Sequence, residues 1–230
     1  MLKFISLILL IALVLHSCNP KLSNGLRASD LNKDVEMITN KGIIIIRLSD
    51  STPLHRDNFL RLAKQGYYDS MLFHRVIKNF MIQSGDPNSK HAKPKEQLGK
   101  GDPGYSIPAE FRESLFHHKG VIAAARISDD VNPMKASSGS QFYIVQGVKF
   151  SAEFLDSFEI RKKIKIPRQE REVYTKIGGT IHLDRSYTVF GETIKGLDVI
   201  DSIASVKTDS LDRPINDVRI IKMKLVKRLK

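Results

Sequence analysis

The chain has 230 residues, 41% of them hydrophobic, which is enough for a real core in one large domain or two small ones. Its single cysteine excludes an intramolecular disulfide, and its formal net charge is +12. The basic residues are dispersed, with their densest groups at 161–163 and 222–230 and no aromatic ladder for stacking bases, so we expect no nucleic-acid partner. A surface that faces solvent or anionic lipid headgroups fits this charge better.

Residues 1–17 have the pattern of a signal peptide. Lys3 supplies a positive start, and residues 4–15 are apolar apart from Ser6, a run too short to span a bilayer comfortably. The segment LVLHSC, which ends at Cys18, resembles the lipobox of bacterial lipoproteins, in which the cysteine is acylated and becomes the first mature residue. A buried or incidental thiol is the alternative. The resemblance implies a lipidated tether over residues 18–30, a domain over 31–230, and a membrane anchor in the bacterial cell envelope, facing the periplasm.

The folded part begins with a predicted hairpin. Residues 35–39 and 42–48 are β-prone runs around turn residues at 40–42. A helix follows, with Thr52 as N-cap and Pro53 at the first helical position, and Gly66 ends it.

Two pairs of short strands are expected next. Residues 73–77 and 80–83 are separated by Lys78 and Asn79, which indicate a turn or bulge. The segment 86–108 is rich in Gly, Pro, Lys and Asn and predicts a long loop. Apolar runs at 120–125 and 141–145, joined by the polar loop 126–140, are typical of buried strands.

The segment 148–179 is predicted to be a helical insertion. Phe150, Phe154 and Phe158 recur at helical spacing, and a second helical stretch ends at Gly178. A strand at 187–194, a short helix at 196–204 and a last strand complete the chain. In that last strand Ile221, Met223 and Leu225 alternate with lysines. Many modest strands with few helices favour an antiparallel barrel or sandwich.

Common hydrolase, nucleotide-binding and zinc-protease signatures do not occur in the sequence. His117 and His118 are adjacent, so on a strand their side chains would point to opposite faces and could not readily share a metal. We therefore expect this pair on a surface turn, and we expect no metal and no cofactor.

Five blocks of sequence, in order along the chain, resemble the cyclophilins, which are peptidyl-prolyl cis-trans isomerases. The blocks are FHRVIKNFMIQSGD (73–86), GYSIPAEF (104–111), GVIAAA (120–125), SSGSQFYI (137–144) and YTVFGETIKGLDVID (187–201). The resemblance implies a mainly β fold: a closed eight-stranded antiparallel barrel capped by two helices, which we expect to begin near Thr52 and near Val148. It also implies that the chain is a rotamase for proline-containing, unfolded or partly folded polypeptides, and we expect a monomer.

The resemblance also assigns the site. Arg75 matches the catalytic arginine, and Gln83 the residue that orients it and contacts the substrate backbone. Proline-pocket walls are implied at Phe80, Met81, Tyr143 (where the family usually has phenylalanine) and Leu183; groove residues at Ala125 and Gln141; and further site positions at His74 and Tyr187. By itself Arg75 would more often be a salt-bridged arginine of an edge strand. Tyr187 could equally be a pocket rim or a structural hydrogen-bonding residue.

One geometric demand and two departures follow. In a strict strand Phe80 and Met81 would point to opposite faces, so a sharp bend is needed near Asn79. Arg126 stands where the family often has a backbone-binding asparagine, and His182 where eukaryotic members carry a tryptophan associated with cyclosporin binding, so we expect weak sensitivity to that drug. A module that binds proline segments with little catalysis is the alternative to an enzyme.

Overall fold

The first hairpin forms where the sequence predicts it. In the computed structural model, which describes residues 25–229, β1 (Lys33–Thr39) and β2 (Gly42–Leu48) pair antiparallel. Alternate residues of both strands, Val35 and Met37 with Ile44 and Ile46, are fully buried. This alternation sets which face of the hairpin is the core.

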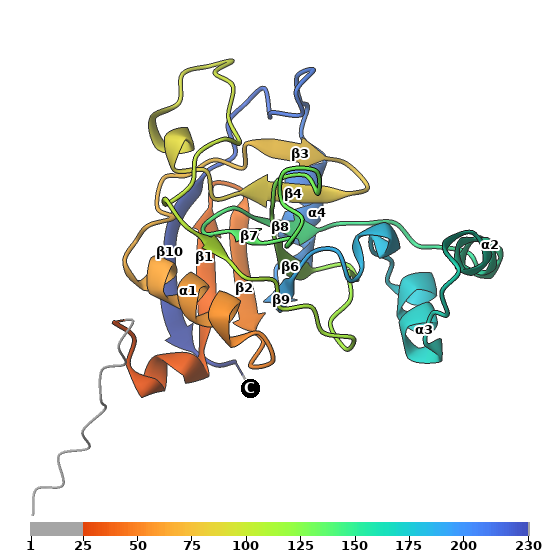
Figure 1. The fold of residues 1–230 in the computed structure, drawn as a ribbon. Coiled ribbons are helices and arrows are strands. Elements are labelled where there is room, and N and C mark those ends of the chain that lie inside the picture. Colours follow the sequence, from red (N-terminus) through yellow and green to blue (C-terminus); the bar gives the residue numbers. More distant parts are fainter. Residues whose placement is uncertain (1–24, 230) are drawn as a thin grey trace, which may run out of the picture.

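Eight strands form one antiparallel sheet, in the order β10-β1-β2-β9-β6-β8-β4-β3 (Figure 1). The remaining members are β3 (Arg75–Ile77), β4 (Met81–Ser84), β6 (Val121–Ala124), β8 (Phe142–Val145), β9 (Val189–Lys195) and β10 (Ile220–Lys227). A separate short pair joins β5 (Ser106–Ile107) to β7 (Ser137–Ser138). The mainly β, antiparallel prediction is confirmed.

The closed barrel is not confirmed, because the hydrogen-bonded ladder is open between β3 and β10. Backbone bonds do join the segment ahead of β3 to the start of β10. The Ser70 N–H donates to the Ile220 carbonyl at 2.9 Å, and the Phe73 N–H to the Val218 carbonyl at 2.8 Å. These bonds, with an isolated bridge between Leu72 and Arg219, curve the sheet around its core without completing a ladder.

Two helices cover this core, and one of them differs from the expected pair. The helix α1 (Pro53–Lys64) begins at Thr52 as predicted, and α4 (Leu197–Ala204) contacts β2, β3 and β4. Both helices bury apolar side chains in the same cluster as the inner strand residues. The helices of the insertion, α2 (Ala152–Lys162) and α3 (Arg168–Lys176), instead project to one side (Figure 1). The prediction that the second cap begins near Val148 was wrong: α2 buries Leu155 and Phe158 in a separate small core, whereas α4 buries its apolar side chains in the main core.

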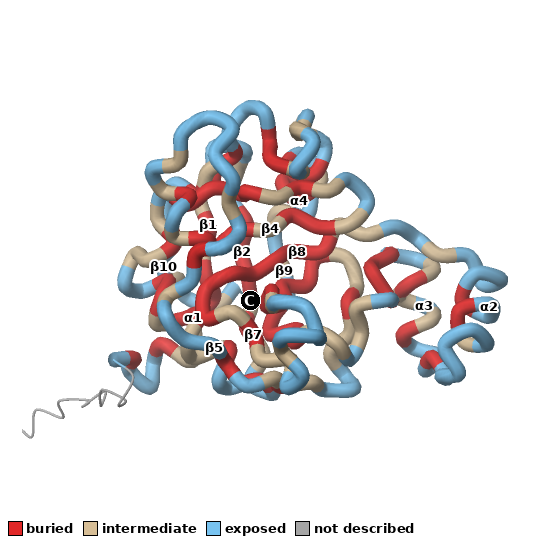
Figure 2. Tube along the Cα trace, turned by 45° about the horizontal axis from the view of Figure 1, so that its top comes forward, coloured by how far each residue is buried: buried red, intermediate tan, exposed pale blue. Residues whose placement is uncertain are grey.

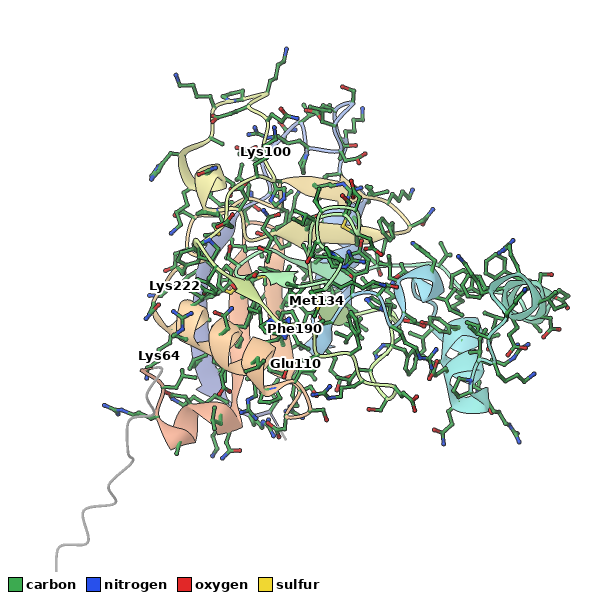
Figure 3. The ribbon with its side chains drawn as sticks, viewed as in Figure 1. Lys64, Lys100, Glu110, Met134, Phe190 and Lys222 are labelled. Atoms are coloured by element: carbon green, nitrogen blue, oxygen red, sulfur yellow. The ribbon has the colours of Figure 1, made fainter. Side chains whose placement is uncertain are left out.

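Glu110 holds the start of α1 in place. Its carboxylate accepts the N–H groups of Leu54 at 3.2 Å and His55 at 3.0 Å, two donors that the helix itself cannot satisfy. The Thr52 side chain makes no capping hydrogen bond, so this long-range carboxylate does what the N-cap residue usually does. Figure 3 shows Glu110 beside the first turns of α1.

The folded domain begins earlier than the predicted boundary at residue 31. Leu26 is fully buried in the core, and Asp30, in the short 3-10 helix Ala28–Asn32, is buried with its carboxylate 2.7 Å from Lys64 Nζ. Leu26 and Asp30 are therefore packed against the domain and do not belong to a free tether. The signal peptide, Cys18 and residues 19–24 lie outside the described residues.

The last strand also departs from the simple alternation. Ile221 is 53% exposed, whereas Ile220 and Met223 are buried. The register with β1 shifts between Ile38 and Thr39, so one residue of β10 has no direct partner and the inward face moves to Ile220. Between residues 25 and 229, no helix is long and apolar enough to cross a membrane.

All residues of β6 and β8 are buried, and so are those of β4 apart from the half-buried Gln83. Figure 2 shows β8 in red. The inner residues of the three strands, Ile82, Ile122 and Ile144, belong to the main core. Their outer residues, Met81, Ala123 and Tyr143, form a second apolar cluster on the opposite face. The candidate site is built on that outer cluster.

Candidate active site

A three-residue turn brings the key side chains of the β3–β4 hairpin together. Residues 78–80 connect the strands, and Asn79 has a φ of 66°, a left-handed conformation that asparagine tolerates better than most residues. Arg75 is the register partner of Gln83, and Ile77 of Met81. The bend that the sequence demands at Asn79 is therefore present.

A cavity of about 380 Å³ opens on the outer cluster and is bordered by nine of the ten residues that the sequence assigns to the site. Phe80, Met81, Tyr143 and Leu183 supply apolar walls. The cavity is also bordered by His74, Arg75, Gln83, Ala125 and Tyr187. The tenth residue, Gln141, borders an adjoining cavity, which Gln83 and Ala125 also border. Of the three arginines that border the cavity, Arg75 has the most exposed side chain, 44% against 4% for Arg126 and 7% for Arg213. A hollow with apolar walls and an accessible guanidinium at its edge can seat a small ring and present donors to it.

The Arg75 guanidinium lies at the edge of this cavity, with 44% of its side chain exposed. Its Nε is 3.5 Å from a carboxylate oxygen of Asp212, and the N–H of the next residue, Val76, donates to the Asp212 carbonyl at 2.8 Å. The sequence predicts Gln83 as the residue that orients this arginine. In the structure Arg75 forms an ion pair with Asp212, and Gln83 lies opposite Arg75 as its register partner on β4.

The Gln83 amide is held by a chain of amide contacts. Its Nε2 donates to Gln141 Oε1 at 3.1 Å, and Gln141 Nε2 donates to the carbonyls of Gly99 at 3.0 Å and Gly101 at 2.8 Å. Gln141 is thus a buried brace for the loop over the site, whose Lys100 is labelled above the hairpin in Figure 3. With Nε2 used, the Oε1 of Gln83 is the group that can still accept a bond from a peptide N–H.

His74 borders the cavity as a neutral ring. Its side chain is buried, and burial lowers its pKa to about 4, with the nearby Arg75 acting in the same direction and Asp86 opposing it. At neutral pH this ring therefore adds apolar surface and no charge to the cavity.

Arg126, which replaces the expected asparagine, is turned back into the protein. Its guanidinium donates to the Ser186 carbonyl at 2.8 Å and pairs with Asp129, and only 4% of its side chain is exposed. It also lies 4.4 Å from the centre of the Tyr187 ring. Arg126 therefore fixes Tyr187 as a rim of the cavity and has few donors left for a peptide backbone. His182, in the place of the family's tryptophan, stacks on Phe80 at 5.4 Å.

The prediction of a surface turn for the histidine pair was wrong for His117, which is fully buried. Its Nε2 is 2.9 Å from the Tyr143 hydroxyl, and its Nδ1 is 2.9 Å from Asp184. No cluster able to hold a metal ion occurs among residues 25–229. Asp212, His117 and Asp184 were not predicted for the site. Asp184 directly follows Leu183, the one signal that could have suggested it, whereas Asp212 comes from a distant polar loop with no periodic pattern.

Comparisons with known proteins agree with the site. Residues 34–225 match the family described as cyclophilin type peptidyl-prolyl cis-trans isomerase/CLD. A Staphylococcus saprophyticus protein, provisionally named a peptidyl-prolyl cis-trans isomerase, is 32% identical over 208 residues, covering 90% of this chain and 98% of its own. A Streptococcus pyogenes protein, provisionally named a bifunctional phosphatase/peptidyl-prolyl cis-trans isomerase, is 36% identical over 192 residues, covering 81% of this chain and only 37% of its own length.

Solved structures support the fold. A crystal structure of a cyclophilin type peptidyl-prolyl cis-trans isomerase from Cryptosporidium parvum has a TM-score of 0.63 at 23% identity, covering 86% of this chain and 99% of that one. A second structure of the same protein, determined in the presence of the dipeptide Ala-Pro, has a TM-score of 0.60 at 22% identity, covering 85% and 99%.

Proposed function

The chain belongs to the cyclophilin-type peptidyl-prolyl cis-trans isomerases, and on that premise we propose that it uses Arg75 and the adjoining apolar cavity to accelerate rotation about Xaa-Pro bonds in exported polypeptides. The observation that carries this proposal is the position of one half-exposed guanidinium at the edge of a cavity walled by Phe80, Met81, Tyr143 and Leu183. The Ala-Pro dipeptide present with a structural neighbour supports a proline-containing segment as the occupant.

The reaction needs no covalent intermediate. Rotation must overcome amide resonance, a barrier of about 18–20 kcal/mol, and the prolyl nitrogen gains a localised lone pair as the bond twists. A donor aimed at that nitrogen stabilises the twisted state more than the planar one, which is the requirement for catalysis. Arginine fits because it donates several N–H groups in a fixed geometry without losing a proton.

The other groups hold the substrate. The apolar cavity seats the proline ring, and its burial fixes one side of the bond that rotates. Gln83, held by Gln141, offers its carbonyl oxygen to a backbone N–H of the bound segment. Asp212 pairs with the guanidinium at the edge of the cavity. The residues that flank the proline would then be gripped while the prolyl bond turns.

Arg75→Ala tests the proposal in a proline-peptide isomerisation assay on residues 25–230, which keep the buried Leu26. We expect kcat/KM to fall about 100-fold or more, as when one preorganised transition-state donor is removed. Lys78→Ala removes an exposed charge from the turn of the same hairpin and serves as the matched control. An unchanged rate in Arg75→Ala would refute the assignment. Normal peptide binding by the wild-type chain with no acceleration would instead favour the proline-binding module.

We also propose that Cys18 carries a lipid and anchors the protein to a membrane of a bacterial envelope, where it acts as a monomer. The support is sequence alone: the apolar run 4–15 and the segment LVLHSC. Labelled fatty acid should be incorporated into the full-length precursor and not into Cys18→Ser, whose isomerase activity should be unchanged. Continued labelling of Cys18→Ser would contradict the anchor without affecting the isomerase proposal.

A further inference from the structure

Buried hydrogen bonds connect the cavity wall to the helical insertion. The Tyr143 hydroxyl is 2.9 Å from His117 Nε2, and His117 Nδ1 is 2.9 Å from Asp184 Oδ1. The other carboxylate oxygen of Asp184 accepts the hydroxyl of Tyr174, in α3, at 2.6 Å. Tyr143, His117 and Tyr174 are buried, and 10% of the Asp184 side chain is exposed. We call Tyr143, His117, Asp184 and Tyr174 the relay.

The carboxylate of Asp184 fixes the direction of two bonds in the relay. Asp184 as a carboxylate can only accept, so His117 donates from Nδ1 and Tyr174 donates from its hydroxyl. Nε2 is the remaining ring nitrogen, and it bonds the Tyr143 hydroxyl at 2.9 Å. Burial raises the pKa of Tyr143 and of Tyr174 above the ordinary value, so both hydroxyls keep their protons. Every member is satisfied, the condition under which a buried polar network is rigid.

The relay is anchored at both ends. Tyr174 is fully buried in a small core with Leu155 and Phe158 of α2, and the rings of Phe116 and Phe150 contact it. This small core is separate from the core inside the sheet. At the other end Tyr143 is a strand residue of β8 and a wall of the cavity. The insertion is thus fixed to the cavity wall by side-chain bonds as well as by the chain.

The base of the insertion is closely packed against the same histidine. The Gly179 N–H donates to the Val148 carbonyl at 2.9 Å, and the Gly179 carbonyl accepts the Val148 N–H at 3.2 Å. The Thr180 N–H donates to the His117 carbonyl at 2.8 Å. A Cβ added to Gly179 would lie 2.1 Å from the His117 carbonyl oxygen, so only glycine fits there. The insertion therefore meets the cavity through a rigid contact, and a change in α3 can be transmitted to it.

We propose that His117, Asp184 and Tyr174 are positioning residues of the isomerase: through the relay, the helical insertion fixes the Tyr143 ring and the chain at Leu183, two walls of the proline-binding cavity. The inference rests on the proposed function. Phenylalanine in place of Tyr143 has no hydroxyl and could make no such bond. Asp184, directly after Leu183, is held by the His117 N–H at 2.7 Å as well as by the two rings, so the Leu183 wall is held by the relay too.

A double-mutant cycle of Tyr174→Phe and Tyr143→Phe tests the relay by isomerisation kinetics. Tyr174 does not border the cavity, and phenylalanine keeps its packing. We expect Tyr174→Phe to raise KM about three- to ten-fold, a misplacement effect, with kcat changed less than about two-fold because Arg75 is untouched. Both variants act on one network, so the double variant should be no worse than the poorer single one.

Two controls separate positioning from general destabilisation. Tyr68→Phe removes another buried tyrosine hydroxyl, from the core inside the sheet, and Arg171→Gln breaks the pairing of α3 with Asp156 of α2 outside the relay. Neither should change KM. Wild-type KM in Tyr174→Phe, or additive effects in the double variant, would overturn the proposal while leaving the isomerase assignment intact.

Nitrogen NMR of the His117 ring gives a readout that does not depend on activity. We expect Nδ1 to carry a proton bonded to Asp184 in the wild type, and shifted ring-nitrogen resonances in Tyr174→Phe. If the wild-type chain fails to accelerate a proline peptide, the proposed function fails and the relay is judged on this spectrum. Ring-nitrogen shifts identical in the two proteins would then overturn the relay as well.

Discussion

The two faces of strands β4, β6 and β8 are both apolar, yet they have different roles. The inner residues Ile82, Ile122 and Ile144 are fully buried in a cluster that includes side chains from α1 and α4. The outer residues Met81 and Tyr143 are as deeply buried, but they border a cavity. Burial alone therefore does not distinguish a core residue from a wall of the site.

The comparison shows how one hairpin can serve both purposes. Successive side chains of a strand point to opposite faces, so the sequence Met81-Ile82-Gln83 alternates between cavity and core. Rigid packing inside the sheet holds the outer side chains in place, and those side chains can differ chemically without entering the core. Stability should therefore depend on the inner face and turnover on the outer face.

Ile122→Ala should give the largest change in stability. The side chain is fully buried in the main core, and its truncation should lower the free energy of unfolding by roughly 2–5 kcal/mol. Urea unfolding measures this loss. Under conditions where the variant is folded, kcat/KM per folded molecule should stay within about two-fold of the wild type. A loss of turnover as large as that of Arg75→Ala would show that the two faces are not separable.

Acid should destabilise the protein through His74. Its folded pKa of about 4 lies below the ordinary value of 6.5, so the unfolded chain binds the proton first as the pH falls. The stabilisation that the neutral, buried His74 gives the folded state is complete above about pH 6.5. It falls progressively towards pH 4, where the free energy of unfolding is lower by roughly 2–3 kcal/mol. The difference in unfolding free energy between wild type and His74→Phe, measured at pH 7 and at pH 4.5, isolates this histidine from titrating carboxylates. If wild type and His74→Phe differ in unfolding free energy by the same amount at both pH values, His74 is not buried as a neutral ring.

Asp212→Asn should give the smallest effect. Its carboxylate pairs with Arg75, but both side chains are more than 40% exposed, so solvent screens the pair. The left-handed φ of 63° at this position is one that asparagine tolerates. We expect kcat to fall about two- to five-fold, which corresponds to less than about 1 kcal/mol, and the melting temperature to be unchanged. A larger loss of stability than of kcat would place Asp212 among the structural residues.

The local parts of the fold and of the site could be predicted, because they depend on residues close in sequence. The hairpin with Arg75, Phe80 and Gln83 follows from one continuous block, and the bend at Asn79 from its geometry. In the insertion, α2 follows from aromatic residues at helical spacing, and α3 from Val173 and Ile177, four residues apart, with Gly178 as the stop.

Pairings that form only in three dimensions could not be predicted. Asp212 reaches Arg75 from a polar loop, and a fully buried His117 gives no sequence signal that separates it from a surface histidine. The choice of α4 over α2 as the second covering helix was missed for the same reason, since it depends on where each helix meets the curved sheet.

Arg75→Lys tests most directly whether the outer face carries catalysis through a correctly shaped donor. Lysine keeps the charge but loses the planar fork, so kcat should fall at least about ten-fold in the proline-peptide assay. Arg75 is half-exposed, and the urea midpoint should match that of the wild type. Wild-type kcat in the lysine variant would contradict the account, because neither the guanidinium geometry nor its placement beside Asp212 would then matter.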